Sequence, residues 1–145
     1  MISSSSKSGL FSTDTASWRR ILRQVKDCGL NHVRFHSWCP PEAAFEAADE
    51  LGVILQPEGP QWGPLEGHGE TEAYVRRECL RIIREYGNHP SFCLFAPGNE
   101  LDRPHGDYLT ELVTELQAAD PRRLYTASSG WGIPQELNPA HADDF

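Results

Sequence analysis

The stretch Asn88-His89-Pro90-Ser91-Phe92-Cys93-Leu94-Phe95-Ala96-Pro97-Gly98-Asn99-Glu100 joins a turn, a short apolar run and a polar end. Residues 92–96 are apolar at both alternating sets of positions, which is typical of a strand buried on both faces in a parallel sheet. We expect Gly98 to end this strand and to leave Asn99 and Glu100 at its C-terminal end. In parallel α/β folds, ligands bind and chemistry occurs at that edge of the sheet.

Helical and extended patterns alternate along the rest of the chain. The spacing predicts helices over about 15–28, 40–52 and 71–86, a fourth helix marked by Leu109, Leu112, Val113 and Leu116, and strands over 31–36, 53–56, 92–98 and 124–127. This order indicates an α/β fold with parallel (β/α) units. A doubly wound sheet and about half of a (β/α)8 barrel both fit, since a complete barrel needs about 250 residues.

Length and charge restrict the classes of partner. The chain has 145 residues and a net charge of −8, which argues against nucleic acid or an anionic membrane surface as a partner. We find no apolar run long enough to span a membrane and no secretory signal, which leaves the compartment open. Residues 1–13 read as a flexible lead-in and residues 14–145 as the folded part. The four cysteines form no C-x-x-C pair and read as free packing thiols.

Polar and aromatic residues gather just after the predicted strands. The groups are His36, Ser37 and Trp38; Glu58 and Trp62; Asn99, Glu100 and His105; and Ser128, Ser129 and Trp131. Three of the four tryptophans therefore fall at one predicted rim, beside carboxylates. Indole rings stack on the C–H face of a sugar while carboxylates, His and Asn bond its hydroxyls, so we expect a carbohydrate as the partner.

Two carboxylates at neighbouring strand ends suit glycosidic chemistry. One carboxyl protonates the leaving oxygen, and a second attacks or stabilises the oxocarbenium ion. Glu58 has a structural interpretation too, because it could accept hydrogen bonds from amides of the Pro57–Pro60 turn. His36 fits a structural partner of a carboxylate as well as a substrate contact. We expect Arg34 to form a buried ion pair and His89 to be structural.

Other chemistries lack motif support. A metal site could be assembled from His36, Glu58, Glu100 and His105, but no H-E-x-x-H or similar spacing is present. No G-x-G-x-x-G or Walker A loop follows a strand, and no G-x-S-x-G elbow is found. We therefore expect no metal and no cofactor.

Three segments together resemble the catalytic barrel of glycoside hydrolase family 2. Residues 29–36 (GLNHVRFH) resemble its G-x-N-x-x-R-x-x-H strand, with one residue fewer between Arg34 and His36. Residues 45–58 resemble its D-E-L-G helix end and following Glu, and residues 88–100 its N-H-P-S…G-N-E segment. The resemblance covers about Trp18 to Trp131. It implies the N-terminal half of a (β/α)8 barrel of the β-galactosidase, β-glucuronidase and β-mannosidase type.

The resemblance also implies roles for single residues. The family's enzymes are retaining exo-glycosidases, so Glu100 would be the general acid/base and Asn99 would contact the sugar 2-hydroxyl. His36 and Glu58 match positions that shape the sugar-binding floor. Two departures are Ser37-Trp38-Cys39-Pro40, where the family more usually has Y-P after the histidine, and Ala96-Pro97, where it commonly has S-L.

The family's nucleophile is a glutamate on a later barrel strand, and Glu136, in a predicted loop, does not fit it. We therefore expect the isolated chain to lack efficient retaining activity. The alternatives are an inverting exo-glycosidase that uses Glu58 and Glu100 as its pair, and a non-catalytic sugar-binding fragment. Open strand edges of a half-barrel also predict self-association.

Overall fold

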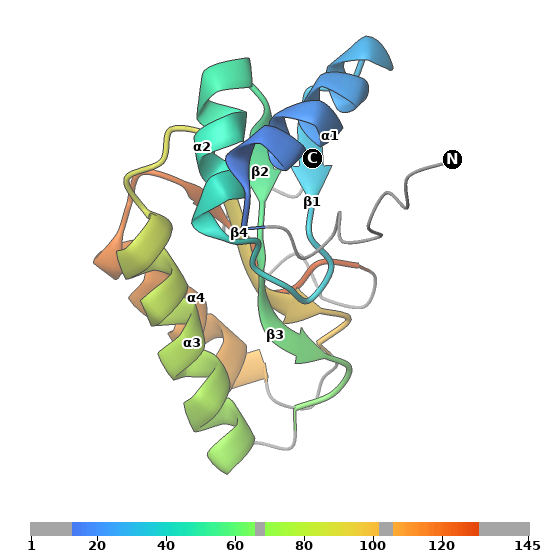
Figure 1. Cartoon of the computed structure of the whole chain (residues 1–145). Coiled ribbons are helices and arrows are strands. Elements are labelled where there is room, and N and C mark those ends of the chain that lie inside the picture. Colours follow the sequence, from blue (N-terminus) through green and yellow to red (C-terminus); the bar gives the residue numbers. More distant parts are fainter. Residues whose placement is uncertain (1–12, 66–68, 102–105, 131–145) are drawn as a thin grey trace.

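Figure 1 shows the computed structural model of the chain, which describes residues 13–65, 69–101 and 106–130. The elements are α1 (Thr15–Asp27), β1 (His32–Arg34), α2 (Glu42–Leu51), β2 (Ile54–Gln56), β3 (Glu58–Trp62), α3 (Glu70–Tyr86), β4 (Leu94–Asn99), α4 (Gly106–Ala119) and β5 (Leu124–Tyr125). The four predicted helices are confirmed. For the three helices whose bounds were predicted, each end lies within two residues of the expected position. The predicted lead-in, except for Thr13, lies outside the described residues.

The strands are parallel and their spatial order follows the chain. β1 pairs with β2, β3 with β4, and β4 with β5, while a bridge between Leu55 and Phe92 joins β2 to the segment before β4. The α/β class with parallel strands is thus confirmed. Within the described ranges each strand is added on the same side, whereas a doubly wound sheet reverses its direction of growth.

The predicted turn at Pro57–Pro60 is wrong, because the chain remains extended there. β3 begins at Glu58, immediately after Pro57, so β2 and β3 form one interrupted strand. The register shifts between Glu58, opposite Ala96, and Gln61, opposite Gly98, which gives β3 one extra residue. A bulge of this kind accommodates proline, which cannot donate a ladder hydrogen bond. Pro57 and Pro60 interrupt the pairing without ending the strand.

The ends of two other strands also differ from expectation. β4 continues through Gly98 to Asn99, which lies opposite Trp62, so Gly98 is inside the strand. β5 is shorter than the predicted 124–127, but a parallel bridge between Asn99 and Ser129 extends its contact with β4. A strand ends where its backbone groups no longer form hydrogen bonds with the neighbouring strand, so its end depends on that neighbour.

Local caps mark the start of α1 and the end of α2. The Asp14 carboxylate accepts hydrogen bonds from Ala16 N–H and Ser17 N–H, at 3.3 and 2.9 Å, at the start of α1. α2 ends at Gly52, whose φ of +65° is left-handed and suits glycine. These two ends agree with the predicted helix ranges, and each is fixed by a local feature of the chain.

The helices cover one face of the strands. α1 packs on α2, and α3 lies beside α4 (Figure 1). The large apolar side chains Phe35, Leu55, Phe95 and Tyr125 are buried in this layer. On the strands, His32 and Arg34 are exposed, and Leu124 is 49% exposed. In the described residues the strands thus have one covered face and one partly open face.

Among the helices described, none is long and apolar enough to cross a membrane. Cys28, Cys39, Cys79 and Cys93 are all free, as predicted, but Cys28 is exposed, so the predicted packing role is wrong for that residue. Cys79 is fully buried in the core, and burial raises the pKa of its thiol.

Candidate active site at the strand ends

An arginine at the end of β1 connects three neighbouring strands. Arg34 Nε donates to Glu58 Oε1 on β3, and Arg34 Nη2 donates to Asn99 Oδ1 on β4 at 2.5 Å. Glu58 is fully buried, and the Arg34 side chain is 38% exposed. The expected ion pair of Arg34 is confirmed. Of its two members, Glu58 is completely buried and Arg34 is partly exposed. A buried carboxylate needs such a partner, because desolvation disfavours its charged form.

The second oxygen of Glu58 is also occupied. Ser37 N–H donates to Glu58 Oε2 at 2.6 Å, and Ser37 Oγ donates to the Gln61 carbonyl at 3.1 Å. Glu58 therefore accepts a backbone amide from the segment after β1 instead of one from its own strand. Ser37 has a φ of +50°, which is uncommon for a residue other than glycine. Both oxygens of Glu58 thus maintain the shape of this edge.

Glu100 immediately follows β4 and has an unusual backbone. Its φ is also +50°, and its N–H donates to the Ser129 carbonyl at 2.7 Å. The carboxylate accepts a hydrogen bond from Trp62 Nε1 at 3.0 Å. Backbone strain of this kind is frequent at functional sites. Because Glu100 follows β4 and bonds to Trp62 at the end of β3, its carboxyl lies at the C-terminal ends of these two strands.

Trp62 and His36 are brought together beside Glu100. The two rings meet edge to face, with centroids 5.4 Å apart and an interplanar angle of 82°. Trp62 is 65% exposed, although tryptophan is highly buried on average. The structure thus gives His36 an aromatic ring partner. The predicted contact of His36 with a sugar stays a prediction.

Gly130 belongs to the site and was missed by sequence reasoning. It follows Ser128 and Ser129 with a φ of +95°, and a Cβ built on it would lie 3.0 Å from Glu100 Cγ and 3.2 Å from Asn99 Oδ1. A larger residue would crowd both side chains and strain the backbone. The available signal was a glycine three residues after the end of the predicted strand 124–127.

Trp38, which was also expected at the rim, is not brought to Glu100. Trp38 stacks on Trp18 with centroids 6.5 Å apart and meets Phe35 edge to face at 5.6 Å, so its ring packs against the core. Trp131 lies outside the described residues, and so do His105 and Glu136. Of the three tryptophans expected at the rim, the structure places Trp62 there.

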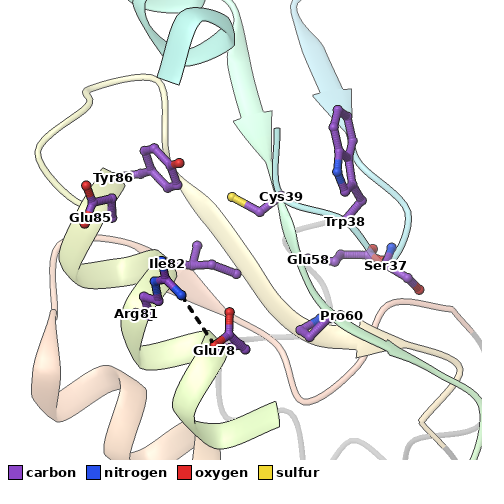
Figure 2. A pocket seen from close by; sticks show the side chains of 10 residues that line it. All are labelled: Ser37, Trp38, Cys39, Glu58, Pro60, Glu78, Arg81, Ile82, Glu85 and Tyr86. Carbon is purple, nitrogen blue, oxygen red and sulfur yellow. Dashed lines mark hydrogen bonds and ion pairs between the residues drawn. The ribbon is translucent and has the colours of Figure 1, made fainter. Parts of the chain in front are cut away.

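A hollow of about 410 Å³ lies behind this edge, between α3 and the segment that follows β1 (Figure 2). Its lining consists of Ser37, Trp38, Cys39, Glu58, Pro60, Glu78, Arg81, Ile82, Glu85 and Tyr86. Glu100, Asn99 and Trp62 are not in that lining. Burial raises the pKa of the Cys39 thiol to about 12, so it is protonated at neutral pH. This hollow is separate from the Glu100 carboxyl.

His89, which was also predicted to be structural, lies in the turn before β4. His89 Nδ1 lies 2.6 Å from Asp49 Oδ2, and Ser91 N–H donates to Asp49 Oδ1 at 2.9 Å. These contacts tie the turn before β4 to α2, which confirms the structural interpretation of His89. Over the residues that the structure describes, no group of three or more His, Cys, Asp or Glu side chains is arranged to hold a metal ion.

Comparison with known proteins gives partial matches. The β-glucuronidase of Bacteroides fragilis is 28% identical over 118 residues, which cover 72% of this chain and 16% of that enzyme. The solved β-glucuronidase of Parabacteroides merdae has a TM-score of 0.70 and 25% identity over 77% of this chain and 15% of its own. A second structure of the P. merdae enzyme holds glycerol in its active site. No protein-family model matches the chain.

The match covers a small part of each relative. This chain spans 11–16% of the length of the curated relatives it matches. The structural match likewise covers a part of a larger enzyme.

Proposed function

This chain matches part of the β-glucuronidases of glycoside hydrolase family 2, as its motifs predicted, and from that premise we propose that it carries the proton-donating part of a glycosidase active site. Glu100 is the general acid/base. Its carboxyl gives a proton to the glycosidic oxygen as the C–O bond breaks, and its carboxylate then takes a proton from the attacking water.

The strongest support is the position of Glu100. Its carboxyl stands at the end of β4, beside the exposed Trp62, and the preceding Asn99 is held by Arg34. Parallel α/β enzymes place their catalytic side chains at this edge. The exposed indole offers a flat apolar surface on which a sugar ring can lie.

We propose that Glu58 positions other groups and does not react. A base in an inverting reaction must contact a water molecule at the anomeric carbon. Glu58 is fully buried, and its oxygens accept from Arg34 and Ser37. These contacts favour the retaining mechanism over the inverting alternative in which Glu58 and Glu100 form the pair. The nucleophile is then a carboxylate outside the described site, as in the family's barrel.

We also propose that the described strands are part of a (β/α)8 barrel. Their parallel pairing in sequence order supports this, because barrel strands follow one another around the ring. The open face with His32, Arg34 and Leu124 would then line the barrel interior.

A segment exchange tests the role of Glu100. The matching segment of the B. fragilis β-glucuronidase is replaced by residues 14–130 of this chain, and hydrolysis of aryl β-glucuronides is measured. We expect turnover, and we expect Glu100→Gln to lower kcat/KM by about 10²- to 10⁴-fold for substrates with poor leaving groups. The loss should be much smaller for activated aryl groups, which need no proton. Unchanged rates in Glu100→Gln with poor leaving groups would contradict the assignment.

Two controls accompany the exchange. Glu111→Gln changes an exposed glutamate on α4 and should leave rates unchanged. The 145-residue chain alone should show no turnover, because a retaining reaction needs a second reactive carboxylate. Sugar binding by the chain alone, measured by calorimetry and unaltered in Glu100→Gln, would instead favour a non-catalytic sugar-binding role.

A further inference from the structure

We propose that Trp62 is a positioning residue for Glu100: its indole N–H holds one carboxylate oxygen, and the His36 ring holds the indole. This inference rests on the proposed role of Glu100 and adds a residue that acts through it.

The backbone around Trp62 explains why its ring reaches Glu100. Trp62 is the last residue of β3 and lies opposite Asn99 in the β3–β4 register. The next residue, Gly63, donates its N–H to the Asn99 carbonyl at 3.1 Å. These contacts keep the end of β3 against the end of β4. The indole is thereby presented to the residue that follows Asn99.

The exposed ring is held by specific contacts. Its N–H donates to Glu100 Oε2 at 3.0 Å, and its ring also pairs edge to face with His36. Trp18 and Trp38, by contrast, stack on each other beside the core. A tryptophan that served only for packing would be buried in the same way. Because Trp62 is 65% exposed, burial does not fix its orientation; the contacts with Glu100 and His36 do.

The direction of the Glu100 side chain is restricted from two sides. The Trp62 N–H lies at Oε2, and Gly130 leaves just enough room at Glu100 Cγ, since a Cβ there would be 3.0 Å away. Arg34 is nearby but donates to Glu58 and Asn99. Glu100 is thus oriented by a neutral donor.

A neutral donor suits a group that must give and take a proton. A cationic partner adds Coulombic attraction to its hydrogen bond, so it favours the charged carboxylate more than a neutral donor does. An ion pair would therefore oppose protonation of Glu100, which the first step requires. The indole N–H fixes one oxygen and leaves the other for the glycosidic oxygen. A misplaced acid costs rate even when the substrate still binds.

Nuclear magnetic resonance of the ¹⁵N-labelled full chain tests the contact directly. Trp62→Phe identifies the Trp62 indole signal by its loss from those of the four tryptophans. We expect this proton to move upfield in Glu100→Ala, while the signals of Trp18 and Trp38 stay in place. It should also shift with pH in the unaltered chain and lose that pH dependence in Glu100→Gln. Glu111→Gln should change nothing.

The outcomes separate the positioning role from the proposed function. A Trp62 signal that is the same in unaltered, Glu100→Ala and Glu100→Gln chains overturns the positioning role. If Glu100→Ala does not fold, as judged by signal dispersion, the comparison with Glu100→Gln decides. These results do not depend on catalysis.

Kinetics of the exchanged B. fragilis enzyme provide the second readout. Trp62→Phe keeps the ring and removes the donor, so kcat for poor leaving groups should fall about tenfold with little change in KM. Wild-type rates in Trp62→Phe, together with a large loss in Glu100→Gln, would overturn the positioning role alone. No loss in Glu100→Gln would overturn the acid/base role of Glu100 itself.

Discussion

Gly98 and Gln61 approach so closely across the β3–β4 pair that a Cβ on Gly98 would lie 2.2 Å from the Gln61 carbonyl oxygen. Glycine is therefore required one residue before Asn99 for a steric reason. The close approach brings the end of β3 to the end of β4, and with it the Trp62 indole to Glu100.

We expect Gly98→Ala to lower the free energy of unfolding by about 1–3 kcal/mol, because two backbones must move apart to admit a methyl group. Urea denaturation followed by circular dichroism measures the change. Gly29→Asn is the control, since nothing lies within 4 Å of its Cβ position and Asn tolerates its φ of +78°. Equal stability of Gly98→Ala and Gly29→Asn would contradict the steric requirement.

Removing the Arg34 guanidinium should leave Glu58 as a buried charge without its cation. We expect Arg34→Met to cost up to about 3 kcal/mol, the lower end for broken buried pairs, because the Arg34 side chain is 38% exposed. The double variant Arg34→Met/Glu58→Met should lose less than the sum of the two single variants. Chemical denaturation of all four chains closes the cycle, and strictly additive losses would argue against coupling.

Asp120 should make stability depend on pH in the acid range. Hydrogen bonds from Arg122, and from the buried Arg123 at 2.5 Å, hold the pKa of Asp120 well below its usual range. Since the folded pKa lies below the unfolded value of about 3.9, the stabilisation is complete above about pH 4 and is lost as the pH falls further. We expect Asp120→Asn to cost about 1.5–3 kcal/mol at pH 7.

The difference between wild type and Asp120→Asn should shrink as the pH falls from 4 toward 2, in thermal or urea unfolding. Glu50→Gln is the matched control, because Glu50 pairs with Arg19 on the exposed surface. The loss of stability in Glu50→Gln should be small, because solvent and salt screen an exposed ion pair. A stability difference for Asp120→Asn that is constant down to pH 2 would contradict the linkage.

Thiol reactivity should follow burial. The thiolate is the reactive form, and burial raises the pKa of the Cys39 thiol to about 12. At pH 8 we expect iodoacetamide to alkylate the exposed Cys28 well before Cys39 or the buried Cys79. Peptide mass spectrometry after timed quenching gives the order, and unfolding in guanidinium should make the cysteines react alike. Rapid native labelling of Cys79 would show that the core opens.

Self-association through strand edges remains a prediction. Among the described residues β1 and β5 each have a strand neighbour on one side, and Leu124 on β5 is 49% exposed. Unpaired edges template pairing with another chain. Sedimentation velocity should show a concentration-dependent dimer, weakened by Leu124→Lys and unaffected by Tyr74→Lys on α3. A stable monomer at all concentrations would contradict the prediction.

Local patterns were enough to determine the class and order of the elements. Apolar spacing placed the four helices, and caps such as Asp14 and Gly52 set their ends, because these signals act within one or two turns of the chain. Apolar strands between helices similarly required a parallel α/β arrangement. The motif around Asn99 and Glu100 indicated the strand ends at which the candidate site lies.

Other features required contacts between distant segments. Pro57 and Pro60 read as a turn, yet the chain stays extended there because β4 supplies a partner and the bulge absorbs the missing donors. From the sequence, the ring of Trp38 could lie either at the rim or against the core. It packs against the core because it stacks on Trp18 of α1.

The site shows the same division. Its chemical groups could be predicted from the sequence, because carboxylates and indoles after strands are visible in the chain itself. Their partners could not, since Arg34, Glu58 and Asn99 come from three strands whose register determines which atoms meet. The α/β class and the edge that carries Glu100 follow from local patterns in the chain. Tertiary structure alone decided that Trp62 donates to Glu100 while Glu58 is buried, because hydrogen-bond geometry and burial depend on packing between segments that spacing does not encode.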